Sequence, residues 1–315
     1  MVPKLIDRYA ARQEDAVPET FPFTKTPLWQ HTLGQSVSCA GPGLHLGGHV
    51  RLGLHPAQVD TGLVFRRTDV GASKVSILLH PKAVCQTRRG TSVGNAQGVS
   101  IATTEHVLAA LSACAIDNAY IDIDGPEVPA MDGCAKAFTD MISKASVVAQ
   151  KTPRRFIEVC KTVTCRDGAR QVRLDPADGL LISAHIEYPN TAIGTQDYEF
   201  QASAAHFIAD IAPARTFALA HEVAALKEAG LGLGGTLDNC LLVDGMDIEN
   251  PDGLRFADEF VRHKVLDILG DIALLGAPLR GRFTSNCAGH ALNNALVQAL
   301  MADPEAWRWS IPASA

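Results

Sequence analysis

The sequence predicts an α+β protein made of two similar domains, each a β-sheet with helices packed on it. Three observations predict this class. Alternating apolar and polar runs between Gly and Pro turns are typical of strands. Longer runs with apolar residues three and four apart are typical of helices. One order of elements also occurs twice along the chain. With 315 residues, 47% of them hydrophobic, the chain is long enough for two packed domains.

The first half is expected to open with strands and close with helices. Residues 1–27 mix charge and proline without periodicity, and are predicted to be a flexible extension. A helix is predicted from Thr103 or Thr104 to about Ala115, capped by a threonine hydroxyl. Asp117-Asn118, a strand and a second helix follow it. The predicted strands are 35–40, 50–55, 62–67 and 119–124, and the second helix is about 133–148.

The same order of elements recurs in the second half. A helix leads through a glycine-rich turn to Asp238-Asn239, a strand, a loop and another helix. This order predicts a duplicated unit. The predicted parts are a first domain over 28–150, a second over 151–305 and a tail over 306–315. The second-half elements are helices over about 219–229, 257–275 and 291–301, strands over 156–163, 171–174, 180–186 and 198–201, and the repeated strand 240–244.

Composition excludes several classes of protein. The net charge of −6 argues against a nucleic-acid binder, because such proteins gain affinity from Lys and Arg on phosphates. Eight cysteines without a CxxC pair suit reduced thiols in a cytoplasmic protein. No signal-peptide core follows the N-terminal charges, and no apolar run reaches the ~18 residues that a transmembrane helix needs. No obligate protein partner is evident.

One helical stretch carries a polar stripe. His263, Asp267 and Asp271 are four residues apart and therefore lie on one face of an otherwise apolar helix. Buried carboxylates need a partner or a cation, because an unpaired buried charge costs several kcal/mol. A His and an Asp at this spacing can supply two ligands to one zinc ion. They also occur as ordinary helix contacts, so both interpretations stay open here.

The pair Glu105-His106 falls in the first turn of the predicted 104–115 helix. His106 can complete a three-ligand zinc set with His263 and Asp267, which leaves the fourth position for water. Glu105 can then act on that water without binding the metal. The alternative is a helix-capping glutamate beside a core histidine.

Two further residues are candidates for catalysis. His290 lies on a turn before a helix, where it can act as a general acid or oxyanion partner oriented by Asp271. The hydroxyl of Thr216, after Ala-Pro-Ala-Arg, can polarise a carbonyl. A helix-capping histidine and a strand-end threonine are the alternatives.

Nucleotide-fold motifs are excluded. Gly230, Gly232 and Gly235 have dinucleotide-fingerprint spacing, but they follow a predicted helix and precede a strand, the reverse of what that motif requires. No P-loop motif occurs in the chain.

Several short motifs occur in one order between about residues 28 and 300. They are Gly43-Leu44-His45, Thr104-Glu105-His106, the stretch 126–133 from Pro126 to Gly133, Ala214-Arg215-Thr216-Phe217, Leu233 to Asp238, Asn250 to Phe256, Val261 to Asp271, and Gly289-His290 through Asn293. Together these motifs resemble the zinc-dependent UDP-3-O-acyl-N-acetylglucosamine deacetylases of bacterial lipid A synthesis.

The resemblance implies a fold and a set of roles. Two α+β domains of like topology would hold the active site between them. His106, His263 and Asp267 would bind Zn²⁺, although Fe²⁺ suits the same ligands. Glu105 would be the general base. His290, supported by Asp271, would assist as acid or oxyanion partner, and Thr216 would contact the oxyanion. The residues implied for the UDP-linked substrate are Lys264, His45, Phe217, Asp238 and Tyr188.

The chain departs from the family pattern at several positions. Cys287 stands where a Lys or Arg near the diphosphate is usual, Pro213 precedes the Ala-Arg-Thr-Phe motif, Leu219 replaces an aromatic residue, and residues 87–92 carry charge near the expected acyl passage. The main expectation is hydrolysis of the substrate N-acetyl group in lipid A synthesis. A paralogue acting on another acylated amino sugar, or a catalytically silent zinc-binding relative, are the alternatives. Retention of Glu105 and His290 speaks against the silent relative.

Overall fold

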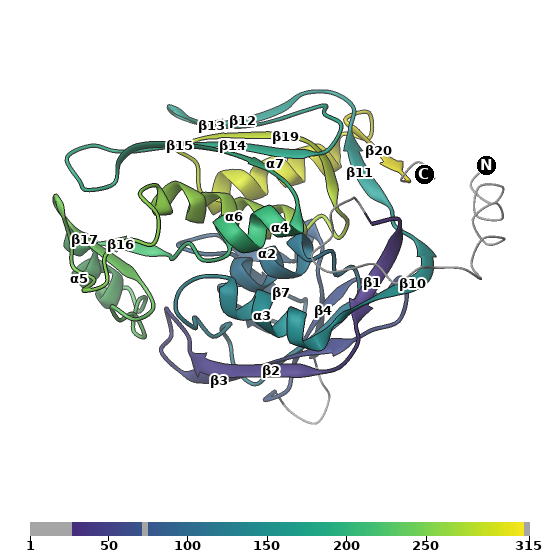
Figure 1. Cartoon of the computed structure of the whole chain (residues 1–315), viewed down its shortest axis with the longest axis horizontal. Helices are drawn as coiled ribbons and strands as arrows, with labels where there is room; N and C mark the ends of the chain where they lie inside the picture. Colours follow the sequence, from purple (N-terminus) through teal and green to yellow (C-terminus); the bar gives the residue numbers. More distant parts are fainter. Residues whose placement is uncertain (1–26, 71–74, 312–315) are drawn as a thin grey trace.

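The computed structural model describes residues 27–70 and 75–311. The extension predicted over 1–27 therefore lies outside the described residues, apart from Pro27. The predicted α+β class is confirmed. A layer of helices lies between two β-sheets (Figure 1). No helix among the described residues is long and apolar enough to cross a membrane.

The first sheet has five strands in the order β2-β3-β9-β4-β5. Its central strand β9 pairs antiparallel with β3 and parallel with β4. Two smaller sheets, β1-β10 and β6-β7-β8, accompany it. The strands are β1 Trp29–Leu33, β2 Val37–Pro42, β3 His49–Pro56, β4 Leu63–Arg67, β5 Val75–Leu78, β6 Val84–Gln86, β7 Ser92–Gly94, β8 Ser100–Ile101, β9 Ala119–Ile123 and β10 Val147–Pro153; the short turn η2 is Pro81–Ala83.

The second sheet has seven strands, with β19 pairing with β11, β13 and β14. The residues predicted to be a tail include an edge strand, β20, which pairs antiparallel with β11. The strands are β11 Phe156–Val159, β12 Val163–Asp167, β13 Arg170–Asp175, β14 Leu180–Tyr188, β15 Gly194–Gln201, β19 Leu279–Asn286 and β20 Trp307–Ser310.

A further three-stranded sheet with one helix projects from the side of the molecule (Figure 1). It consists of β16 Phe217–Leu219, β17 Leu241–Asp244, β18 Asp247–Ile248 and the helix α5 Ala220–Glu228. The repeat predicted from sequence matched β9 with β17. Because β9 is central in the five-stranded sheet and β17 lies in this separate sheet, the two matched stretches do not occupy equivalent places, and the duplication stays a prediction.

The four predicted helices between the two large sheets begin and end close to their predicted bounds, and a short helical segment over 204–211, which was not predicted, lies with them. These elements are α2 Glu105–Ala113, α3 Lys136–Ala145, α4 Ala204–His206 with the π-helical turn η3 Phe207–Ile211, α6 Glu259–Ala273 and α7 His290–Ala302. Helices α2 and α6 pack against each other at the centre, and nearly every residue of both is buried.

The crossing of α2 and α6 depends on a glycine. A Cβ on Gly270 would lie 2.2 Å from the carbonyl oxygen of Glu105, which is closer than any side chain can approach. The absence of a side chain therefore lets the two backbones touch. This contact brings the first turn of α2 beside the polar stripe of α6.

Candidate active site

The polar stripe of α6 is buried and internally paired. His263 Nε2 lies 3.2 Å from Asp267 Oδ1, and both side chains are almost inaccessible to solvent. The other ring nitrogen, Nδ1, is 3.0 Å from the carbonyl oxygen of Ala214 and donates its proton there. This bond orients the ring and places Nε2 beside Asp267, as in histidines whose other ring nitrogen binds a metal.

His106 on α2 completes a cluster of three donors. Its ring is 4.9 Å from the ring of His263 and nearly perpendicular to it. The donor atoms of His106, His263 and Asp267 all lie within 4.8 Å of one another. Ligands of a tetrahedral zinc ion are about 3.4 Å apart, since each bond is close to 2.1 Å. The buried His/His/Asp set therefore fits a metal ion with little movement.

Protonation states in the cluster suit ligation. Burial, followed by the nearby His263, lowers the pKa of His106 to about 3, so its imidazole is neutral at physiological pH. Burial raises the pKa of Asp267, but Lys264 and His263 outweigh it and hold that pKa well below its usual value. Lys264 Nζ donates to Asp267 Oδ2 at 2.6 Å. The site thus offers the neutral imidazole of His106 and the carboxylate of Asp267, with Nε2 of His263 beside them.

Glu105 lies next to the cluster but is not one of its donors. Its Oε2 accepts the backbone N–H of Thr91 at 2.9 Å, and its Oε1 is 3.9 Å from His290 Nε2. Burial raises the pKa of Glu105 to about 7. A carboxylate whose pKa is close to neutral can take a proton and return it during one catalytic cycle.

His290 at the start of α7 is held by a network around Asp271. Its Nδ1 is 2.9 Å from Asp271 Oδ2, and Nε2 points toward Glu105 and Asp267, 3.9 Å from an oxygen of each. Asp271 also accepts bonds from Thr91 Oγ1 at 2.5 Å and Asn293 Nδ2 at 2.8 Å. The Asp271 carboxylate therefore fixes the ring of His290 through Nδ1 and leaves Nε2 directed at Glu105 and Asp267.

These groups share a cavity of about 360 Å³. Its wall includes the three candidate ligands together with Glu105, His290, Lys264, Thr216, Phe217, Tyr188 and Cys287. The rings of Tyr188 and Phe217 meet edge to face, with centroids 5.7 Å apart. The structure thus brings together most of the residues singled out in the sequence, from α2, α6, α7, β14 and β16.

Two predicted substrate residues lie elsewhere. His45 lines an adjoining, more apolar cavity of about 280 Å³ that shares Thr216 and Phe217 with the first, and its Nε2 is 3.1 Å from the carbonyl oxygen of Arg89. Asp238 is exposed and lines neither of these two cavities.

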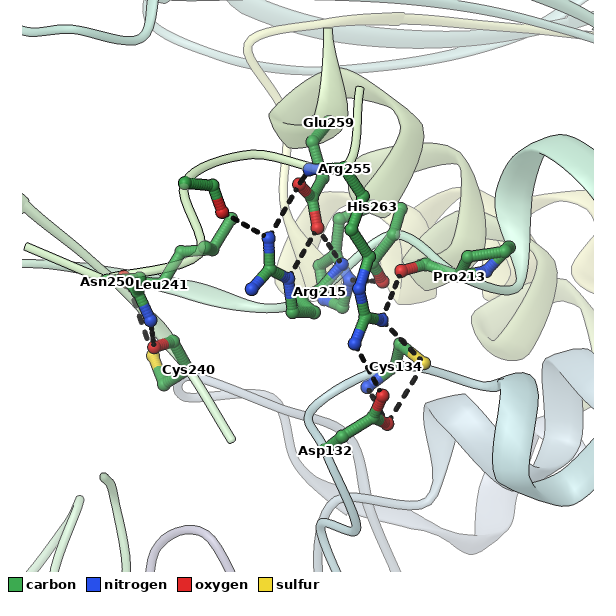
Figure 2. Close-up of polar contacts among 12 residues, drawn as sticks. Asp132, Cys134, Pro213, Arg215, Cys240, Leu241, Asn250, Arg255, Glu259 and His263 are labelled. Atoms are coloured by element: carbon green, nitrogen blue, oxygen red, sulfur yellow. Dashed lines mark hydrogen bonds and ion pairs between the residues drawn. The ribbon is translucent and has the colours of Figure 1, made fainter. Parts of the chain in front are cut away.

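The segment that orients His263 is itself anchored (Figure 2). Arg255 donates to the carbonyl of Pro213 at 2.8 Å and to Asp132 at 2.9 Å. The buried carboxylate of Glu259 accepts the backbone N–H and the guanidinium of Arg215 at 3.0 and 2.8 Å. Ala214 is therefore fixed through both of its chain neighbours, and its carbonyl cannot drift from His263.

Sequence reasoning assigned no role to Thr91, Asn293, Arg255 or Glu259. Thr91 is 180 residues from its partner Asp271, and Arg255 is 123 residues from Asp132. The available signals were the threonine in the charged stretch 87–92 and the charged residues flanking the α6 stripe. Neither signal names a partner.

Comparison with known proteins agrees with this geometry. The family model described as LpxC, UDP-3-O-acyl N-acetylglycosamine deacetylase, matches residues 30–302. The UDP-3-O-acyl-N-acetylglucosamine deacetylase of Phenylobacterium zucineum is 47% identical, over 89% of this chain and 96% of its own length. Proteins with the same name from Acidithiobacillus ferrooxidans and Neisseria meningitidis are 43% and 42% identical, each over 89% of this chain and 92% of their own. This chain therefore belongs to the UDP-3-O-acyl-N-acetylglucosamine deacetylase family.

Proposed function

We propose that this protein hydrolyses the N-acetyl group of UDP-3-O-acyl-N-acetylglucosamine and releases acetate, a step in lipid A biosynthesis. The observation that carries the proposal is the buried His106/His263/Asp267 cluster beside the non-ligand carboxylate of Glu105. A purely structural metal site needs no such neighbouring base and usually has four protein ligands.

The donor chemistry fits a zinc ion, and Fe²⁺ suits the same three residues. When bound, such an ion lowers the pKa of a coordinated water toward about 7 and polarises the carbonyl of the scissile amide. His106 Nε2 or Nδ1, His263 Nε2 and an oxygen of Asp267 would hold it. The hydrogen bond from His263 Nδ1 to Ala214 supports this assignment, since it fixes the tautomer of that ring.

Two residues, Glu105 and His290, transfer protons during the reaction. Glu105 accepts a proton from the attacking water, and its pKa of about 7 matches this task at neutral pH. His290 is protonated, because Asp271 raises its pKa to about 10 although burial lowers it. The imidazolium donates to the departing amine as the C–N bond breaks, and Thr216 steadies the oxyanion. Acetate and the free amine are the products.

Substrate binding is assigned to residues around both cavities. Lys264 and the edge-to-face pair Tyr188 and Phe217 line the catalytic cavity, and the adjoining apolar cavity offers room for a 3-O-acyl chain. His45, in the wall of the second cavity, and the exposed Asp238, which lines neither cavity, complete the proposed set. The two-domain division at 28–150 and 151–305 is also a proposal, as is a cytoplasmic location, which the eight free cysteines support.

Acetate release tests the proposal directly. Metal-replete protein would be incubated with UDP-3-O-acyl-N-acetylglucosamine and, in parallel, with the same acylated amino sugar lacking UDP. We expect equimolar acetate and amine from the nucleotide sugar and a much lower kcat/KM for the sugar alone. Preference for the sugar without UDP would favour the diverged paralogue. Turnover of neither by protein that contains metal would reject the deacetylase function.

A further inference from the structure

A second group of potential metal ligands lies beside the catalytic cavity. Donor atoms of His185, Glu187 and Cys287 all lie within 4.8 Å of one another. None of the three belongs to the His106/His263/Asp267 set. Only Cys287 lines the catalytic cavity, so this group adjoins the first site without sharing a donor with it.

The sheet explains why these residues meet. His185 and Glu187 are two apart on β14, on the face opposite the buried Ile182, Ala184 and Ile186. Strand β19 runs parallel beside β14 (Figure 1), and Cys287 is the first residue after it. The backbone N–H of Cys287 donates to the carbonyl of His185 at 2.8 Å. The cysteine is therefore tied to the same strand that carries the other two donors.

The donor types select a class of cation. Imidazole, carboxylate and thiolate together suit zinc and similar borderline ions, whereas Mg²⁺ and Ca²⁺ prefer oxygen ligands alone. His185 Nδ1 also lies 2.8 Å from Asp197 Oδ1, on the neighbouring strand β15. A carboxylate on one ring nitrogen leaves the other free for a metal and makes it more basic.

We propose that His185, Glu187 and Cys287 form a second site for a divalent cation of the zinc class, with Asp197 holding the His185 ring. The site is separate from the catalytic ligand set and does not depend on the substrate assigned to the enzyme. It is half-exposed, so solvent supplies the fourth ligand. The thiolate of Cys287 is its distinguishing feature, because the first set contains no sulfur.

Cobalt binding tests this inference on the full chain. Co²⁺ would be titrated into metal-free protein while the near-ultraviolet spectrum is recorded. The first equivalent fills the sulfur-free set, and we expect a thiolate-to-cobalt charge-transfer band to rise only with the second equivalent. Cys287→Ser should abolish the band, and His185→Gln should weaken the second binding event about tenfold or more. Both variants should still bind the first equivalent.

Cys165→Ser is the matched control, because Cys165 is a half-buried thiol on β12 outside the group. It should keep the band at full intensity. A wild-type protein without the band, or a Cys287→Ser variant that retains it, overturns the proposal. If Cys287→Ser fails to bind the first equivalent, the partly exposed His185→Gln provides the same readout without a change after β19.

Discussion

His290 and Asp271 form an ion pair in which the imidazole Nδ1 is 2.9 Å from the carboxylate Oδ2. Thr91 and Asn293 donate to the same carboxylate and hold it in place. Burial alone lowers the pKa of His290, but Asp271 raises it to about 10. The imidazole is therefore charged at neutral pH and can give a proton through Nε2.

Asp271→Asn tests this pairing. Loss of the carboxylate charge lowers the pKa of His290. In the variant, His290 therefore loses its proton at a lower pH than in the wild type. We expect acetate release at neutral pH to fall about tenfold to a hundredfold. The descending limb of kcat/KM against pH should move toward acid. Asp303→Asn, at a partly exposed residue that pairs with Lys161 instead of a residue of the cavity, should change neither. An equal loss at every pH would contradict the proton-donor role.

Gly270→Ala tests the contact between α2 and α6. The new methyl group would meet the Glu105 carbonyl at 2.2 Å, and two packed backbones cannot both yield. Overpacking of this kind costs about 1–3 kcal/mol or more of unfolding free energy. Gly179→Ala, where a Cβ meets nothing within 4 Å, is the control and should shift it by less than about 0.5 kcal/mol. Urea unfolding measures the free energy of unfolding of both variants. A Gly270→Ala variant as stable as the wild type would contradict the close contact.

Arg255→Ala tests the anchoring of Ala214. Without the guanidinium, the Pro213 carbonyl loses its 2.8 Å bond and the carbonyl that orients His263 gains freedom. We expect zinc affinity, measured by competition with a chelator, to fall about tenfold. Arg173→Ala removes an exposed ion pair on β13 and should leave affinity unchanged. An unchanged affinity in Arg255→Ala would show that Ala214 needs no such anchor.

The buried His31 on β1 should make the free energy of unfolding depend on pH. Burial, helped by the charge of Arg154, lowers its pKa from 6.5 to about 4. As the pH falls below 6.5, His31 becomes protonated in the unfolded chain, whereas in the folded protein it stays neutral until about pH 4. Acidification between these two values therefore lowers the free energy of unfolding. At 1.36 kcal/mol per pKa unit, the difference in unfolding free energy between wild type and His31→Gln should narrow by about 2 kcal/mol from pH 7 to pH 5. Parallel curves would contradict this expectation.

Local patterns explain why much of the fold was predictable. The α6 stripe repeats every four residues among apolar neighbours, and the predicted helix 257–275 contains the observed Glu259–Ala273. The edge strand β20 was missed because its four residues carry little pattern of their own, and pairing with β11 joins positions about 150 apart. Likewise, the strand order that separates β17 from β9 depends on long-range pairing.

In the candidate site, too, features that depend on local spacing could be predicted, and those that depend on long-range contacts could not. The spacing of His263, Asp267 and Asp271 alone indicated a shared face, whereas the approach of His106 required the α2–α6 crossing at Gly270. The partners Thr91 and Asn293 could not be derived, since a hydroxyl or amide in a sequence does not identify its acceptor. Resemblance to a family supplied the roles, and the structure supplies the distances.

The most direct test of the account is the rate of acetate release by Glu105→Gln at a metal content equal to that of the wild type. Glu105 is a base and not a ligand in this account, and the glutamine keeps an oxygen for the Thr91 N–H. We therefore expect unchanged metal content with kcat about 10²- to 10⁴-fold lower. A variant that turns over at the wild-type rate, or that no longer binds the metal, would contradict the assignment of Glu105 as the general base.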